Sequence, residues 1–80
     1  MDFDQTHMIA FGRRVRWLRR DQDLSQEALA ADAQVHRNHL GAIERGTKQA
    51  GLLTIIRLAQ ALGVPVGSLF ETINPADTAD

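Results

Sequence analysis

The sequence predicts an all-α fold of five helices. Ala, Leu, Arg and Gln are frequent and tyrosine is absent, a composition that favours helices. No segment shows the apolar–polar alternation of a half-buried strand, whereas apolar residues recur at helical spacing in runs that end at turn-forming residues. A length of 80 residues fits one domain.

The first predicted helix is marked by an apolar stripe. Phe11, Val15 and Leu18 recur at i, i+4 and i+7, so they lie on one face of a helix. We expect this helix to end near residues 22–23, although Asp23 adopts a left-handed cap conformation less readily than a glycine.

Two short helices joined by a tight turn are predicted next. Ser25 is a good N-cap for a helix over residues 26–31, because its hydroxyl can accept a hydrogen bond from an N–H group of the first turn. Residues 31–34 form the turn. A third helix covers residues 36–45, and Gly46 ends it as a C-cap.

The C-terminal part of the chain predicts two more helices. One covers residues 52–62 and is closed by Gly63, and a short one starts after Pro65 and covers residues 66–71. The inward stripe of the fourth helix is expected to be Ile55, Leu58, Ala59 and Leu62. The residues of the last helix that are expected to close the core are Leu69 and Phe70.

We expect the domain to occupy residues 9–73. Residues 1–8 are expected to form a flexible N-terminal segment. The pair Asn74-Pro75 breaks any helical continuation, so the small and polar tail over residues 74–80 is expected to be disordered.

Composition excludes several classes of protein. The chain has no cysteine, which removes disulfides and thiolate metal sites and fits a reducing cytosol. No apolar run approaches the ~20 residues of a membrane span. The N-terminus lacks the basic cluster of a signal peptide. We therefore expect a cytoplasmic protein with no cofactor, no metal and no membrane partner.

The formal net charge of −1 hides an uneven distribution. Five arginines fall between residues 13 and 20, whereas the acidic residues gather mainly at the chain ends and between residues 21 and 32. A basic face can therefore coexist with an acidic total, as a nucleic-acid binder requires. A solvated helix face explains the same arginine run equally well.

The two short helices and their turn predict a rigid corner packed on the first and fourth helices. Leu40 and Ile43 form the buried face of the third helix, which leaves Arg37, Asn38 and His39 on its outer face. Such a corner can lay one helix across the DNA backbone and the next into the major groove, where small or polar residues reach the bases.

Three stretches carry a resemblance to a known family. They read Leu24-Ser25-Gln26-Glu27-x-Leu29-Ala30, Ile43-Glu44-Arg45-Gly46 and Leu58-Ala59-x-Ala61-Leu62-Gly63-Val64. Over residues 11–70 the chain resembles the Cro/phage-repressor (XRE) helix-turn-helix family, which implies a compact lambda-repressor-like DNA-binding domain. The start of the third helix, His36-Arg37-x-x-Leu40, and its end are further similar to controller proteins of restriction–modification systems.

The resemblance implies roles for individual residues. The base-contacting positions are Arg37, Asn38, His39 and Ala42. The phosphate-contacting positions are Ser25, Gln26, His36, Arg45, Thr47, Lys48 and Gln49. Arg19 and Glu44 match a structural ion pair between the first helix and the end of the third. The remaining arginines of the first helix are expected to be solvated or to act as distant steering charges, and they are Arg13, Arg14, Arg16 and Arg20.

The third helix departs from the family pattern. Gly41 inside it costs roughly 1 kcal/mol relative to alanine, and Ala42 offers only an apolar contact. Few long polar side chains face the bases, so we expect much of the specificity to come from DNA shape.

These roles predict a DNA-binding transcription regulator that is not an enzyme. We expect a homodimer on a pseudo-palindromic operator, with its recognition helices roughly 34 Å apart. Its dimer surface is expected around Val66, Phe70 and Ile73, where apolar residues exceed what the core needs. Occupancy of DNA would block or recruit RNA polymerase, and the resemblance to controller proteins implies self-regulation.

One other functional interpretation stays open. An antitoxin-like module of the same fold would bury its exposed apolar residues Val64, Val66 and Ile73 against a different protein. His36 and His39 have an i, i+3 spacing that suits metal ligands, but no third ligand is evident nearby in the sequence, so surface or DNA-facing histidines are the favoured interpretation. An enzyme is disfavoured because the carboxylates are scattered and the sequence holds no Gly-rich phosphate loop.

Overall fold

The computed structural model describes residues 2–71, and in that range it shows four α-helices and one short 3₁₀ helix but no strand. The elements in chain order are α1 (Phe3–Asp21), α2 (Gln26–Ala33), α3 (Arg37–Arg45), α4 (Leu52–Leu62) and the 3₁₀ helix η1 (Val66–Phe70). The prediction of an all-α fold is confirmed, and its fifth helix is the 3₁₀ segment.

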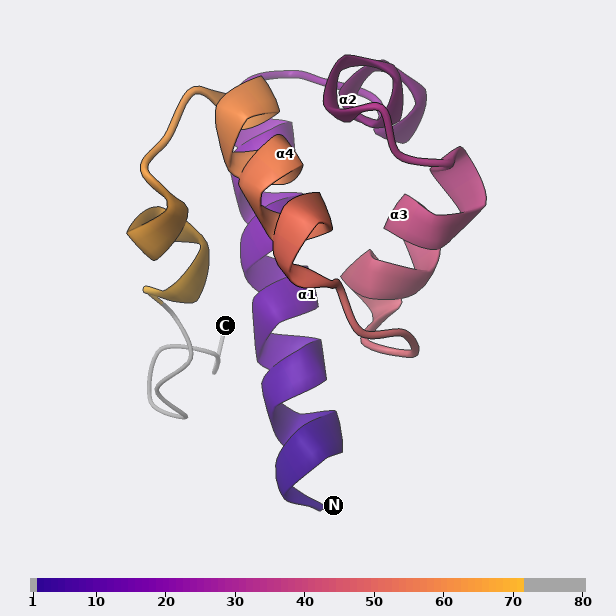
Figure 1. Ribbon diagram of the computed structural model, residues 1–80, viewed down its shortest axis with the longest axis vertical. Helices are drawn as coiled ribbons and strands as arrows, with labels where there is room; N and C mark the ends of the chain where they lie inside the picture. Colours follow the sequence, from indigo (N-terminus) through magenta and orange to yellow (C-terminus); the bar gives the residue numbers. More distant parts are fainter. Residues whose placement is uncertain (1, 72–80) are drawn as a thin grey trace.

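Helix α1 runs along the length of the molecule, and its N-terminal end extends beyond the other helices (Figure 1). The helix begins at Phe3 because the carboxylate of Asp2 accepts a hydrogen bond of 2.7 Å from the Gln5 N–H group and so caps the first turn. The segment 1–8, predicted to be flexible, is thus helical from its third residue onward. The predicted tail over residues 74–80 lies outside the described residues.

Every helix contributes to an apolar core. Its largest fully buried side chains are Val15, Leu29, Leu40, Ile43, Leu58 and Leu69. Phe70 does not close the core as predicted, because 43% of its surface is exposed and its ring packs on Phe11 with 5.3 Å between the ring centroids. Val64, predicted to be exposed, is half-buried against the core.

Residues with a left-handed backbone end α2, α3 and α4. Gly46 and Gly63 adopt φ angles of 76° and 69°, and the predicted C-caps of α3 and α4 are confirmed. Gln34, with φ of 56°, ends α2 two residues later than predicted, and its N–H group donates to the Ala31 carbonyl oxygen at 3.2 Å. A single left-handed residue therefore sets the turn between α2 and α3.

Candidate nucleic-acid interface

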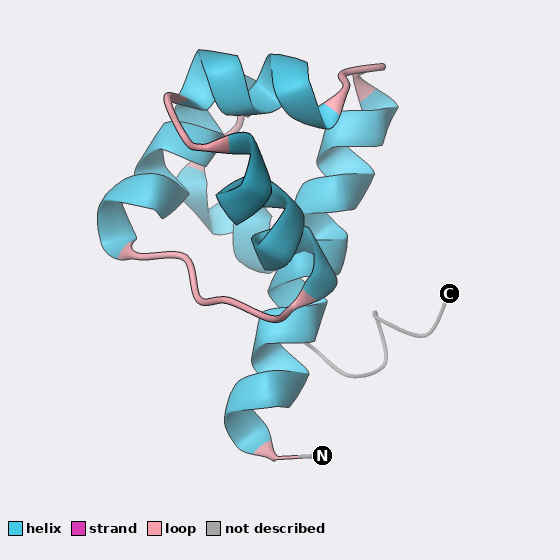
Figure 2. Cartoon of the chain, turned by 90° about the vertical axis from the view of Figure 1, so that its right-hand side faces the viewer, coloured by secondary structure: helices cyan, strands magenta, loops and turns pink. Residues whose placement is uncertain are grey.

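Helices α2 and α3 meet in a tight turn and form a corner on one side of the molecule. Figure 2 looks at this side and shows α3 in front, with α2 above it and the loop 46–51 below it. Across the turn, the Val35 N–H group donates to the Ala30 carbonyl oxygen at 2.9 Å. Leu40 and Ile43, which are 0% and 1% exposed, hold α3 against the core, so its opposite face points to solvent.

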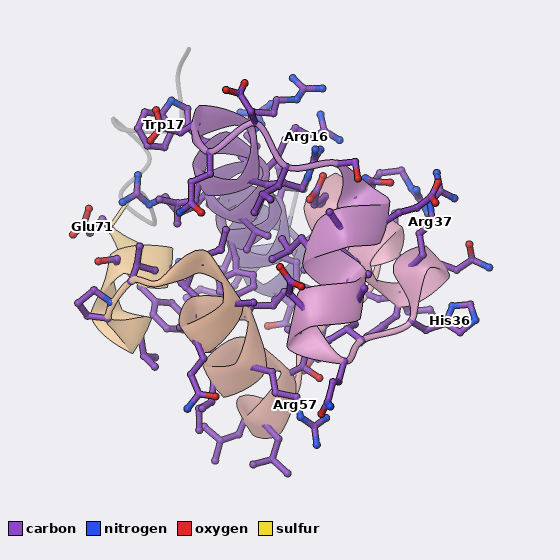
Figure 3. All side chains as sticks on the ribbon, turned by 90° about the horizontal axis from the view of Figure 1, so that it is seen from above. Arg16, Trp17, His36, Arg37, Arg57 and Glu71 are labelled. Atoms are coloured by element: carbon purple, nitrogen blue, oxygen red, sulfur yellow. The ribbon has the colours of Figure 1, made fainter. Side chains whose placement is uncertain are left out.

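The first turn of α3 presents the side chains that the sequence predicts to contact bases. Arg37 and Asn38 are exposed and His39 is half-buried. The Nε atom of Arg37 lies 3.7 Å from Oε1 of Glu27, and because both side chains are exposed this ion pair holds Arg37 only weakly. Figure 3 shows Arg37 and His36 projecting away from the body of the domain. These side chains can therefore reach a ligand that approaches α3.

The middle of α3 contributes little side-chain surface. Ala42 is 9% exposed, so only the edge of its methyl group can meet a base. Gly41 is buried beneath two side chains, since a Cβ there would lie 3.2 Å from Nη1 of Arg45 and 3.7 Å from Oε1 of Gln26. The side chains of Gln26 in α2 and Arg45 in α3 therefore cover the position that a side chain would take here.

The start of α2 carries two residues predicted to contact phosphate. The Ser25 hydroxyl accepts a hydrogen bond of 3.0 Å from the Ala28 N–H group and so caps the helix. The Gln26 side chain donates from Nε2 to Oε1 of Glu44 at 3.0 Å. Both side chains have structural partners, and the positive end of the helix dipole is the feature that favours an anion here.

The other predicted phosphate contacts lie at the two ends of α3. His36 caps the helix through Nδ1, which accepts a hydrogen bond of 3.2 Å from the Asn38 N–H group. After the helix, the hydroxyl and the N–H group of Thr47 both donate to the Ala42 carbonyl oxygen, at 3.2 and 3.0 Å. The exposed residues at this end are Arg45, Thr47, Lys48 and Gln49.

A buried ion cluster ties this corner to α1. The fully buried carboxylate of Glu44 accepts two hydrogen bonds from Arg19, from Nε at 2.7 Å and from Nη2 at 3.0 Å. Arg19 also donates to the Leu24 carbonyl oxygen at 2.8 Å. Arg16 brings its Nε to 3.5 Å from Oε1 of Glu44, the oxygen that also accepts from Gln26. The cluster joins α1, α2 and α3.

The pKa values of this cluster follow from its contacts. Burial by itself raises the pKa of Glu44, but the hydrogen bonds from Arg19 and Gln26 and the charges of Arg19 and Arg16 outweigh it, so this pKa lies below its ordinary value. The hydrogen bond to Glu44 raises the pKa of Arg19 against the opposing effect of burial. Both groups are therefore charged at neutral pH.

The prediction that the other arginines of α1 are solvated is wrong at two positions. The Arg14 side chain is 12% exposed and donates to the Ser68 carbonyl oxygen and to Oε2 of Glu71, each at 2.7 Å. Arg16 joins the Glu44 cluster. Its place one helical turn before the predicted ion-pair residue was a signal for this contact. Nothing local signals the partners of Arg14, which lie 54 and 57 residues away.

The predicted dimer contacts that the structure describes are exposed apolar side chains. Val66 and Phe70 are 39% and 43% exposed, while Ile73 lies outside the described residues. Phe70 also lines an open groove of about 410 Å³, whose other lining side chains are mainly apolar and come from α1, α4 and the segment before α4. Sequence reasoning missed three more exposed apolar residues, namely Phe3, Leu52 and Leu53.

Two further kinds of site are absent from the residues that the structure describes. Within residues 2–71, no three His, Asp or Glu side chains lie close enough together to hold a metal ion. In the same part of the chain, no helix has both the length and the apolar character needed to cross a bilayer.

Known proteins with similar sequences and known proteins with similar structures indicate the same kind of protein. The family model HTH_3, described as helix-turn-helix, matches residues 15–69. Control protein C.BamHI of Bacillus amyloliquefaciens is 38% identical over 64 residues, which cover 79% of each chain. Control protein C.MunI of a Mycoplasma species is 33% identical over 66 residues, or 81% of this chain and 89% of the relative. The crystal structure of the restriction-modification controller protein C.AhdI from Aeromonas hydrophila is 40% identical, with a TM-score of 0.78 over 79% of this chain and 96% of that one.

Proposed function

The chain belongs to the helix-turn-helix family HTH_3 and is a DNA-binding transcription regulator, and from that premise we propose that it acts as a homodimer on a pseudo-palindromic operator, as an autoregulating controller of the restriction–modification type. One observation carries the proposal. Arg37 and Asn38 project from the first turn of a helix whose other face is held in the core by Leu40 and Ile43. This exposed turn, together with the control proteins that the chain resembles, supports double-stranded DNA as the ligand.

In this proposal α3 enters the major groove, which is wide enough to admit a helix. Arg37 binds guanine through O6 and N7, and Asn38 binds adenine through N6 and N7. The N-terminus of α2 and the exposed Lys48 bind phosphates, which position the domain without specifying sequence. Because α3 has few long side chains on this face, DNA shape supplies part of the specificity.

The base-reading role is tested on duplexes selected from a random pool. Arg37→Ala is expected to relax discrimination at one base position by about 1–3 kcal/mol, because a bidentate contact is lost. Lys48→Ala is expected to weaken binding to all sequences alike and to reduce the salt slope of binding by about one. If both variants weaken every sequence to the same extent, Arg37 does not read a base.

The dimer surface is proposed around Val66 and Phe70, which are exposed apolar side chains. Two-fold symmetry then spaces the two copies of α3 roughly 34 Å apart, one turn of DNA. Val66→Asp is expected to shift sedimentation equilibrium at tens of micromolar toward the monomer while keeping the circular-dichroism spectrum of a folded helical domain, because Val66 is exposed. If the unaltered chain itself sediments as a monomer, an antitoxin-like module with a different protein partner becomes the better candidate.

Regulation in this proposal follows from occupancy of DNA. A dimer bound across a promoter blocks RNA polymerase, and one bound upstream recruits it. The proposal includes no catalytic step and places the protein in the cytoplasm with the DNA that it regulates.

A further inference from the structure

We propose that a cationic groove on α1 is a second DNA-contacting surface, which binds the sugar–phosphate backbone beside the helix-turn-helix. The groove has a volume of about 480 Å³ and is lined by Arg13, Arg16, Trp17, Arg20 and Asp21. The inference rests on the proposed function, because it extends the DNA footprint of the same domain.

The lining residues form one face of α1. Positions 13, 16, 17 and 20 have the spacing i, i+3, i+4 and i+7, which aligns their side chains over two helical turns. Three guanidinium groups accompany one carboxylate, that of Asp21, and the indole of Trp17 is 53% exposed. The groove is therefore positively charged and has an aromatic ring in its wall.

Arg16 connects this groove to the start of α2. Its Nε lies 3.5 Å from Oε1 of Glu44, and the same oxygen accepts a hydrogen bond from the first residue of α2. In Figure 3, Arg16 lies between Trp17 and Arg37 along one edge of the molecule, whereas Arg57 lies at the opposite edge. A DNA strand whose phosphate sits at the N-terminus of α2 therefore has the groove directly beside it.

The charges at this junction favour a further anion. Arg16 and Arg19 share the single carboxylate of Glu44, so the cluster has one surplus positive charge. The Nε of Arg16 is buried and has no hydrogen-bond partner among residues 2–71, while 39% of the side chain is exposed. A phosphate matches the forked geometry of a guanidinium group. A duplex supplies phosphates in series, and this series suits a row of arginines better than a single free anion does.

Trp17 makes occupation of the groove directly measurable, because it is the only tryptophan of the chain. Its fluorescence is open to quenching by acrylamide, since 53% of its surface is exposed. Saturation with a duplex of random sequence at low salt is expected to lower the quenching constant at fixed protein concentration. An unchanged quenching constant in the bound state overturns the proposal.

Two variants test the arginines themselves. Arg16→Gln and Arg20→Gln are each expected to reduce the slope of log affinity against log salt by about one between about 50 and 200 mM salt, because each removes one phosphate contact. Arg57→Gln, at the opposite edge, is the matched control and is expected to keep the slope of the unaltered chain. If Arg16→Gln lowers the melting temperature through Glu44, the exposed Arg20 still provides the test.

The outcomes separate this inference from the function that it extends. If the unaltered chain binds duplex DNA and both variants keep its salt slope, the groove does not bind DNA and the proposed function stands. If the unaltered chain binds no duplex, both proposals fail. If the variants bind DNA normally but lose activation in a transcription assay, the groove contacts an acidic protein surface and the proposal is overturned.

Discussion

Replacing Glu44 with glutamine is expected to lower the free energy of unfolding by about 3–5 kcal/mol. The carboxylate is fully buried and is the counter-ion of Arg19, whose side chain is only 10% exposed. A neutral amide leaves this guanidinium without its counter-charge and removes one of the two acceptor oxygens that Arg19 and Gln26 use. Because small domains are stable by only about 5–15 kcal/mol, this loss is a large fraction of the total.

Glu27→Gln is the matched control for this experiment. Glu27 lies 3.7 Å from Arg37 and both side chains are exposed, so its loss should change the free energy of unfolding by less than about 0.5 kcal/mol. Urea unfolding followed by circular dichroism at neutral pH measures both variants. Equal unfolding free energies for the two variants would contradict a stabilising role for the buried pair.

Acid is expected to remove the same stabilisation from the unaltered chain. The pKa of Glu44 lies below its ordinary value of 4.5 in the folded chain, so the ionised carboxylate stabilises the fold above that value. This contribution is lost as the pH falls from 4.5 through the lower pKa of the folded state. The difference between the unaltered chain and Glu44→Gln should therefore narrow on acidification in urea titrations, and a difference independent of pH would count against the assignment.

Local chemistry explains why much of this fold could be predicted from the sequence. Ser25 as an N-cap and Gly46 and Gly63 as C-caps place three helix boundaries, because each acts within one turn of its own position. The burial of Leu40 and Ile43 follows from helical spacing in the same way. Together they orient α3 and with it the candidate interface.

Contacts between distant parts of the chain explain what could not be predicted. Arg14 resembles a solvated member of a basic run, because the sequence does not show that Ser68 lies beside it. The burial of Ala42 likewise depends on how α3 packs on the rest of the domain. The close approach of α1 and α3 is likewise a property of the packed structure.

Gly12 allows α1 and α3 to pack with their backbones in contact. It is buried, and a Cβ there would overlap the carbonyl oxygen of Ile43 and lie 2.7 Å from that of Glu44. Backbone atoms cannot rotate away as a side chain can, so Gly12→Ala must push the last turn of α3 away from α1. We expect a loss of about 3 kcal/mol or more in unfolding free energy, because the shift also stretches the hydrogen bonds between Arg19 and Glu44.

Gly67→Ala is the control for this substitution, because a Cβ there meets no atom of the described residues within 4 Å. It should keep or slightly raise the melting temperature, since alanine restricts the unfolded chain more than glycine does. Thermal unfolding of the two variants side by side measures the difference. If Gly12→Ala melts together with Gly67→Ala, α1 and α3 can separate without cost, and the close backbone contact is not what holds α3 in the orientation that presents Arg37 to a duplex.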